Sequence, residues 1–182
     1  MKKFYIKISK FLSYILRHHP ERFGILLDDE GFADLTLILN VVNERYEENV
    51  ITRQTIEDII DRSDKKRYEI VDDRIRAFYG HTIDMKIKMK EAEFFPVKLY
   101  HGTNKHAYEL IKEVGLKRIG RQYVHLSDTI ETAYTVGKRR AREPVILEID
   151  TNKAKMKGVL FYHSGDMYLA DFIPSDCISL TD

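Results

Sequence analysis

The segment Leu99-Tyr-His-Gly-Thr103 decides how the second half of the chain is interpreted. Its first residues are apolar or aromatic and predict a buried strand, and its end carries a histidine, a glycine and a hydroxyl. Because Gly102 has no Cβ, we expect a ligand to approach the strand closely at this point. The segment therefore indicates a place where a nucleotide is held.

The composition of the whole chain is that of an ordinary globular protein. It has 182 residues, of which 43% are hydrophobic and 32% charged, with a net charge of +1. Basic and acidic residues are nearly balanced in each half, so any contact with a polyanion must come from local clusters. Cys177 is the single cysteine, which excludes an internal disulfide and is expected in the core. With no signal-peptide core and no apolar run long enough for a bilayer, we expect a cytoplasmic protein. Because no long exposed apolar stripe is left over, we expect a monomer.

The first half of the chain predicts three short helices followed by a β-hairpin. Apolar residues recur at helical spacing over residues 4–18, and Pro20 prevents that helix from continuing. Asp34 and Thr52 are suited to cap a second and a third helix. Strands are expected at residues 67–71 and 74–79, joined by a turn at 72–73. Helices followed by a two-stranded wing predict a winged-helix module.

The second half predicts a mixed α/β domain. Residues 84–95 are rich in Lys and Glu and have no strong hydrophobic period, so we place the domain boundary there, with domains at 1–92 and 93–182. Helices are expected from Asn104 to Val114, closed by Gly115, and after a cap at Asp128. Strands are expected at residues 97–101, 123–126, 145–149, 159–163, 167–169 and 177–180.

Two basic clusters in the first half each permit two interpretations. Arg17 and His18 stand at a helix end, where cations gain about 0.3–1 kcal/mol from the helix dipole, or where they form a phosphate site. Arg67 and Arg76 belong to the expected hairpin, which is either a solvated charged surface or directs some arginines inward.

The expected strand at 123–126 carries a third candidate group. Arg121, Tyr123 and His125 share one face of an extended segment. The arginine is either a surface cation beside a half-buried ring or part of a binding site.

Several common catalytic motifs are absent from the sequence. It has no Gly-rich phosphate loop, no dinucleotide-binding fingerprint, no metal-ligand spacing and no Gly-x-Ser-x-Gly elbow. This disfavours metal-dependent and serine hydrolysis. The excess of Arg and His at element ends is suited to binding phosphates without a metal.

Six short motifs occur together in an order that resembles the RNA 2′-phosphotransferase family (KptA, the tRNA-splicing phosphotransferase type), and the resemblance covers nearly the whole chain. The motifs are Leu16-Arg-His-His-Pro20, Lys66-Arg67-Tyr-Glu-Ile70, Ile75-Arg-Ala-Phe-Tyr-Gly-His81, Leu99-Tyr-His-Gly-Thr103, Arg121-Gln-Tyr-Val-His-Leu-Ser127 and Val136-Gly-x-Arg139.

The resemblance implies an α+β fold with two lobes. A winged-helix, RNA-binding lobe is followed by an ADP-ribosyltransferase-like (PARP-like) lobe that binds NAD, with the active site in the cleft between them. The implied substrate is an RNA, such as a spliced tRNA, with an internal 2′-phosphate. That phosphate attacks the nicotinamide ribose of NAD, which is consumed as co-substrate, and gives an ADP-ribosylated RNA phosphate. The ribose 2″-hydroxyl then releases 2′-hydroxyl RNA and ADP-ribose 1″,2″-cyclic phosphate, and no metal takes part.

The resemblance also implies roles for individual residues. Arg17, Arg67 and Arg121 match the family's phosphate-binding arginines, and His18 matches a residue that contacts the phosphate and positions the attacking hydroxyl. The positions matched to NAD binding are His101, Gly102, Thr103, Ser127 and Arg139. The positions matched to RNA binding are Arg76, Gly80 and His81.

The sequence leaves some alternatives open. Arg140 stands beside Arg139 where a glycine is usual in the family, so either arginine is a candidate for the NAD site. The same NAD chemistry could modify another acceptor, such as a terminal nucleic-acid phosphate or a protein side chain. A winged-helix DNA-binding regulator is an alternative of a different class, and the natural RNA substrate is not determined.

Overall fold

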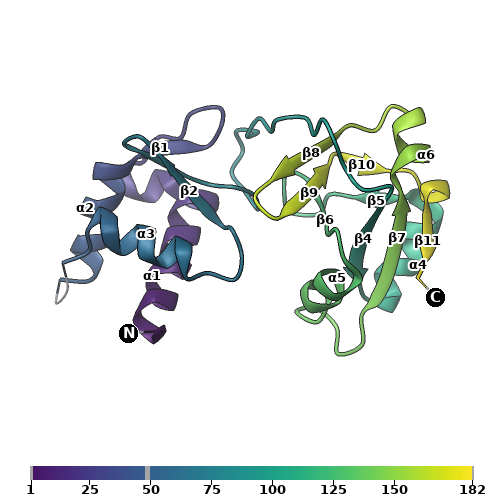
Figure 1. Ribbon diagram of the computed structural model, residues 1–182, viewed down its shortest axis with the longest axis horizontal. Coiled ribbons are helices and arrows are strands. Elements are labelled where there is room, and N and C mark those ends of the chain that lie inside the picture. The colour runs from purple at the N-terminus through teal and green to yellow at the C-terminus, as the bar shows by residue number, and fades with distance from the viewer. Residues whose placement is uncertain (1, 48–49, 182) are drawn as a thin grey trace. The chain divides into compact units, whose positions relative to one another are not determined.

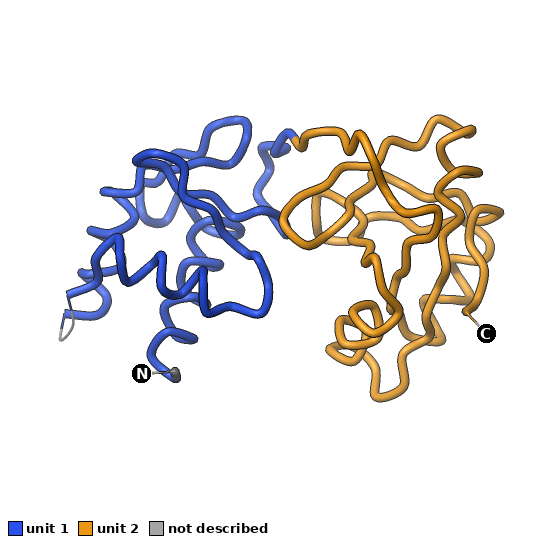
Figure 2. The backbone as a smooth tube through the Cα atoms, viewed as in Figure 1, with its two compact units in different colours: residues 1–88 blue, residues 89–182 orange. Residues whose placement is uncertain are grey.

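The computed structural model describes residues 2–47 and 50–181, so the outer ends of the two expected domains, Met1 and Asp182, lie outside the described residues. The chain forms two compact units, residues 1–88 and 89–182 (Figure 2). Both units combine helices with small antiparallel sheets, which is a mixed α/β architecture.

Unit 1 packs three α-helices against a three-stranded sheet (Figure 1). Its strands are antiparallel in the order β1-β3-β2. The elements are α1 (Lys2–Arg17), a 3₁₀ turn (Pro20–Phe23), β1 (Phe32–Asp34), α2 (Leu35–Arg45), α3 (Arg53–Asp61), β2 (Tyr68–Val71) and β3 (Arg74–Ala77).

The helices of unit 1 begin where the sequence predicts. The Asp34 carboxylate accepts from the Leu37 backbone N–H, and the Thr52 hydroxyl accepts from that of Thr55. The apolar stripe of α1 supplies much of the core, and Ile8, Leu12, Ile15 and Leu16 are completely buried.

Two expectations for unit 1 are wrong. A strand, β1, precedes α2, so the first strand comes before the second helix; at three residues it is too short to show an alternating pattern. The charged segment 84–95 also contributes to a core, because Ile87 is completely buried and lies beside Gly31. The buried residues Ile87 and Ala92 stand apart between exposed charged ones and give no sustained period, which is why the sequence alone did not reveal this packing.

Unit 2 contains three small antiparallel sheets, in the orders β11-β7-β4, β6-β9-β8 and β10-β5. Its elements are β4 (Lys98–Thr103), α4 (Lys105–Val114), β5 (Leu116–Lys117), β6 (Val124–Leu126), α5 (Ile130–Gly137), β7 (Val145–Asp150), α6 (Thr151–Met156), β8 (Phe161–Ser164), β9 (Met167–Ala170), β10 (Phe172–Ile173), a 3₁₀ turn (Ser175–Cys177) and β11 (Ile178–Leu180).

The expected elements of unit 2 are present with some corrections. Asn104 caps α4 and Gly115 follows its end, as predicted. The cap of α5 is the Thr129 hydroxyl, which accepts from the Thr132 backbone N–H, and not Asp128. Cys177 is buried as expected but lies in a 3₁₀ turn before β11.

Gly102 and Gly137 explain how α5 packs against β4. A Cβ on Gly102 would lie 2.1 Å from the Ala133 carbonyl oxygen and 3.0 Å from the Gly137 Cα. The missing side chain of Gly102 therefore admits the helix, and the expectation that it leaves room for a ligand on that side is wrong.

Candidate functional site

The guanidinium of Arg17 is the centre of the arrangement in unit 1. Arg17 is the last residue of α1, and its guanidinium lies over the rings of Tyr68 and Tyr79, at 5.6 and 5.1 Å from their centroids. Its Nη2 donates to the Arg67 carbonyl oxygen at 3.3 Å, and its Nε is buried with no hydrogen-bond partner among the described residues. The guanidinium is held in one orientation while part of its donor capacity is unused.

The charge environment of Arg17 favours an anion. Burial lowers the pKa of the Arg17 guanidinium, the two tyrosines oppose this, and the positive charge of Arg67 lowers it further. Two cations held near each other repel, and a bound phosphate would remove that repulsion.

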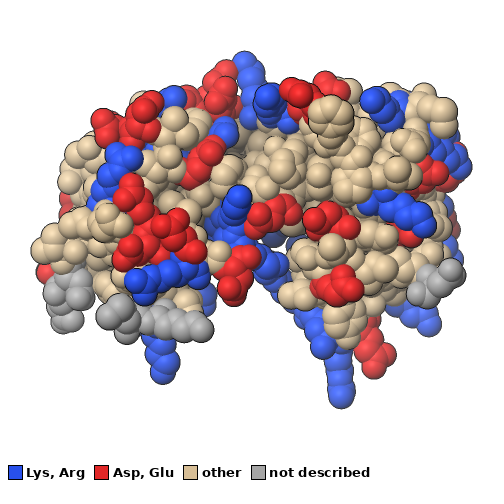
Figure 3. All heavy atoms as spheres, in the orientation of Figure 1, with Lys and Arg blue, Asp and Glu red and all other residues tan. Residues whose placement is uncertain are grey.

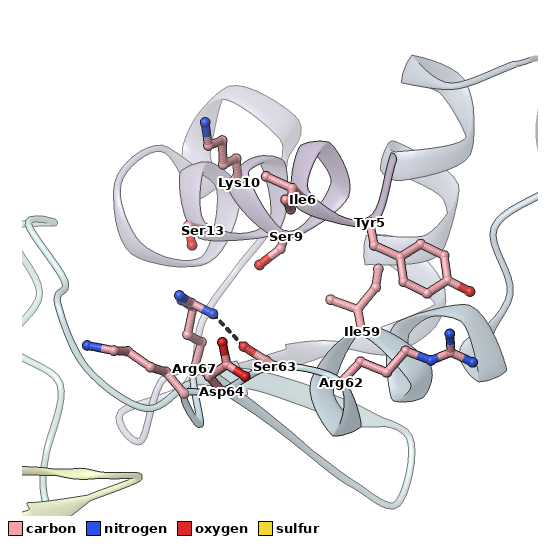
Figure 4. A pocket seen from close by; sticks show the side chains of 11 residues that line it. Tyr5, Ile6, Ser9, Lys10, Ser13, Ile59, Arg62, Ser63, Asp64 and Arg67 are labelled. Atoms are coloured by element: carbon pink, nitrogen blue, oxygen red, sulfur yellow. Dashed lines mark hydrogen bonds between the residues drawn. The ribbon is translucent and has the colours of Figure 1, made fainter. Parts of the chain in front are cut away.

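Arg67 belongs to the segment that leads into β2. Its Nη1 donates to Ser63 Oγ, as Figure 4 shows, and its backbone carbonyl accepts from the Phe78 N–H at 2.9 Å. The guanidinium lines a pocket of about 750 Å³ whose other walls come from α1 and α3. The structure thus brings together Arg17 and Arg67, two residues predicted to bind phosphate.

His18 is fixed by the segment that follows β3. Its Nδ1 lies 2.9 Å from Thr82 Oγ1, and the Thr82 backbone N–H donates to the Arg17 carbonyl at 2.9 Å. Gly80 has a φ of +92°, and a Cβ there would lie 3.5 Å from Arg17 Nη1. The segment at 80–82 therefore closes around the end of α1, and its glycine is required by the backbone conformation.

Arg76 is paired with other side chains of unit 1, and His81 is buried. Arg76 forms ion pairs with Glu69 and Glu30 and lies 4.4 Å from the centroid of the Phe32 ring. His81 is 1% exposed, and neither ring nitrogen has a hydrogen-bond partner among the described residues. Burial, together with the charges of Arg17, His18 and Arg76, lowers the pKa of His81 to about 4.

In unit 2, His101 is held as a neutral ring. Its Nδ1 lies 2.9 Å from the His125 carbonyl oxygen, so Nδ1 carries the proton and Nε2 is an acceptor. Burial lowers the pKa of His101, the bond to His125 opposes this, and the charges of Arg140 and Arg121 lower it further. An acceptor nitrogen in this position is suited to a ligand hydroxyl.

Thr103 and Ser127 are both associated with β4, the strand that carries His101. Thr103 is the last residue of β4, and Ser127 pairs with Tyr100 through two backbone hydrogen bonds of 2.8 Å. Both residues are nearly buried, with exposures of 7% and 2%. Thr103 therefore follows His101 on the same strand, and Ser127 is held against that strand through Tyr100.

The arginines of unit 2 are on its surface. Arg121 lies in a bend before β6, outside the strand face where it was expected with Tyr123 and His125, because β6 begins only at Val124. Arg139 and Arg140 are both exposed in the turn after α5, and of the two only Arg140 perturbs His101. The charge of Arg140 therefore acts on His101, near the end of β4.

Some contributors were not predicted from the sequence. Tyr68 and Tyr79 enclose Arg17, and their only sequence signal is that they flank predicted site residues at 67 and 80. The pocket next to Arg67 has no sequence signal, because it is formed by residues far apart in the chain.

Within residues 2–47 and 50–181, no three His, Cys, Asp or Glu side chains are grouped so that they could hold a metal ion. Within the same residues, no helix has the length and apolar character needed to cross a membrane. Basic and acidic side chains alternate over the face seen in Figure 3.

Comparison with known proteins gives one consistent result. Residues 3–170 match the model of a family described as RNA 2′-phosphotransferase, Tpt1/KptA family. The chain is 45% identical over 175 residues to a probable RNA 2′-phosphotransferase of Acetivibrio thermocellus, covering 96% of both proteins. Proteins of the same name from Bacillus thuringiensis and Pyrococcus abyssi are 41% and 38% identical to this chain. The matches cover 98% and 94% of this chain and 97% and 93% of the two relatives.

Proposed function

This chain belongs to the RNA 2′-phosphotransferase family, and on that premise we propose that it removes an internal RNA 2′-phosphate by transferring it to ADP-ribose from NAD. The observation that carries the proposal is the pairing of Arg17 and Arg67. The Arg17 guanidinium, whose Nε has no partner among the described residues, donates to the backbone carbonyl of Arg67, and His18 follows Arg17 in the chain.

In the first step of the proposed reaction, a 2′-phosphate oxygen forms a bond to C1″ of the nicotinamide ribose. The bond from C1″ to the ring nitrogen breaks, and its electron pair leaves with nicotinamide. Arg17, Arg67 and Arg121 orient the phosphate dianion towards C1″. Because the two reacting groups are held in place, the step becomes effectively unimolecular.

In the second step, the ribose 2″-hydroxyl oxygen attacks phosphorus and the bond to the RNA 2′-oxygen breaks. The hydroxyl gives up a proton and the RNA 2′-oxygen gains one, so the products are 2′-hydroxyl RNA and ADP-ribose 1″,2″-cyclic phosphate. Negative charge grows on the phosphoryl oxygens, and the arginines stabilise it in the role that a metal has in other phosphoryl transfers. His18, oriented by Thr82, positions the attacking hydroxyl.

The residues of unit 2 fit NAD. The Nε2 acceptor of His101 and the hydroxyls of Thr103 and Ser127 suit ribose hydroxyls, and Arg140 or Arg139 suits the pyrophosphate. Gly102 contributes through the packing of α5 and not through direct contact on that face. We propose that unit 2 is the ADP-ribosyltransferase-like lobe and unit 1 the winged-helix, RNA-binding lobe.

Two of the residues matched to RNA binding, Arg76 and His81, are assigned a different role. The Arg76 side chain is already paired with carboxylates and His81 is buried, so we assign both to positioning. His81 supports the segment that orients His18, and Arg76 joins β3 to Glu69 of β2.

The test is a short RNA with a radiolabelled internal 2′-phosphate. We expect the label to leave the RNA only when NAD is present, to appear in an ADP-ribose cyclic phosphate, and to be unaffected by EDTA. Release of the label as inorganic phosphate, or release without NAD, would contradict the proposal.

A further inference from the structure

The pocket beside Arg67 has a composition that the reaction at the phosphate does not require. Its volume is about 750 Å³, and all of its lining residues belong to unit 1. Four are hydroxyl side chains, four are cations and one is an acid, whereas the whole chain has a net charge of only +1. The lining residues are Tyr5, Ile6, Ser9, Lys10, Ser13, Ile59, Arg62, Ser63, Asp64, Lys65 and Arg67.

One wall of this pocket is a regular row along α1. Tyr5, Ser9 and Ser13 are spaced four residues apart, so they lie on one face of the helix. In the same spacing the next residue is Arg17. Each interval is a rise of about 6 Å, which is about the length of one extended nucleotide. The row therefore runs along α1 towards Arg17, which stands one interval beyond Ser13 at the end of the helix.

The opposite wall comes from the segment between α3 and β2. Figure 4 shows the Ser9, Ser13 and Ser63 side chains facing the space into which the Arg67 guanidinium points. Arg67 lines the pocket, and its backbone carbonyl accepts from Arg17, so one residue of the proposed phosphate-binding pair belongs to the pocket and the other is bonded to it.

The hydroxyls of the pocket are organised by Tyr68. The Tyr68 hydroxyl donates to the Ser9 carbonyl, so the Ser13 hydroxyl donates to Tyr68 and keeps its own lone pairs as acceptors. At the far end, Arg62 lies 5.7 Å from the centroid of the Tyr5 ring, which gives a flat cationic and aromatic surface. Hydroxyl acceptors, cations and a flat surface are the groups that recognise ribose hydroxyls, phosphates and bases of single-stranded RNA.

We propose that this pocket binds the RNA strand next to the 2′-phosphorylated nucleotide, so that the protein recognises at least one flanking nucleotide. The inference rests on the proposed function.

The test compares a 2′-phosphorylated dinucleotide with the same junction extended by three nucleotides on the 5′ side, the 3′ side or both. For the protein without substitutions, we expect kcat/KM to rise by about fivefold or more on one extended side, with a steeper dependence on salt. The salt dependence reports the additional phosphate contacts.

Two variants of α1 form a matched pair. Lys10 lines the pocket, whereas Lys7 is an exposed lysine of the same helix outside it. Lys10→Glu should lower the ratio of kcat/KM between long and short substrates by about fivefold. Lys7→Glu carries the same charge change and should leave that ratio within about twofold.

The outcomes separate the two proposals. If the protein acts on the dinucleotide but extension on neither side raises kcat/KM, or both variants change the ratio equally, the pocket assignment is wrong and the proposed function stands. If no substrate loses its phosphate in the presence of NAD, the proposed function fails and the pocket assignment with it. Ser9→Phe fills the pocket and should remove the length dependence; a length dependence that persists in this variant would also overturn the assignment.

Discussion

Arg17 Nη2 donates a hydrogen bond to the carbonyl oxygen of Arg67 at 3.3 Å, so two arginines that are 50 positions apart in the chain are joined directly. The bond uses one of the five guanidinium N–H groups, and the buried Nε has no hydrogen-bond partner among the described residues. It also means that the position of Arg17 depends on the backbone at the start of β2.

Arg17→Ala should lower kcat for NAD-dependent phosphate removal by about 100-fold to 1,000-fold, because a single preorganised donor contributes about 2.7–4 kcal/mol. Arg22→Ala is the matched control, since Arg22 donates to Tyr14 and lies outside the site. The measurement is single-turnover kinetics, and a loss within twofold would remove Arg17 from the catalytic set.

The ring of Tyr79 lies 5.1 Å from the Arg17 guanidinium, and Tyr79→Leu removes this contact. A cation–π contact contributes about 0.5–2 kcal/mol, so kcat/KM should fall by about twofold to thirtyfold. Tyr79→Phe keeps the ring and should cause a clearly smaller loss. Equal losses in the two variants would show that the ring does not hold Arg17.

Arg140 and Arg139 can be distinguished through His101. The charge of Arg140 contributes to the lowered pKa of His101, so Arg140→Ala should raise that pKa. Arg139→Ala should leave it where it is. The pKa of His101 in each variant can be measured by NMR titration of its ring. A change in this pKa in Arg139→Ala but not in Arg140→Ala would reverse the assignment.

His81 predicts a loss of stability in acid. Its pKa is about 4 in the folded protein and about 6.5 when unfolded, so between these values the unfolded chain binds the additional proton. The free energy of unfolding should therefore fall by about 3 kcal/mol as the pH drops from about 6.5 to about 4.

Denaturant titrations of His81→Leu across that pH range should show a shallower decline. The decline in the free energy of unfolding should not disappear completely in this variant, because burial also lowers the pKa of His101. His106→Leu, at an exposed histidine, is the control and should keep the full decline. An unchanged decline in His81→Leu would mean that His81 does not titrate in this way.

Gly102→Ala should destabilise unit 2 strongly, because its Cβ would lie 2.1 Å from the Ala133 carbonyl oxygen. The free energy of unfolding should fall by about 3 kcal/mol or more. Gly158→Ala tests the alternative that any glycine replacement is costly: Gly158 has a φ of +82° but nothing within 4 Å of a Cβ, so about 1 kcal/mol is expected.

Local sequence signals determined most of the secondary structure. The period of α1, the caps at Asp34, Thr52 and Asn104 and the turn at 72–73 all act over a few residues, so each could be read without the fold. The short strand β1 and the cap at Thr129 were missed because they give weak or ambiguous local signals.

The sequence by itself also determined the family, because six short motifs in a fixed order need no coordinates. Only the tertiary structure decided the use of each side chain. It joined Arg17 to Arg67, enclosed Arg17 with Tyr79, buried His81 and turned Gly102 towards α5. These relationships join residues far apart in the chain, and their energies depend on burial and distance, which local sequence patterns do not contain.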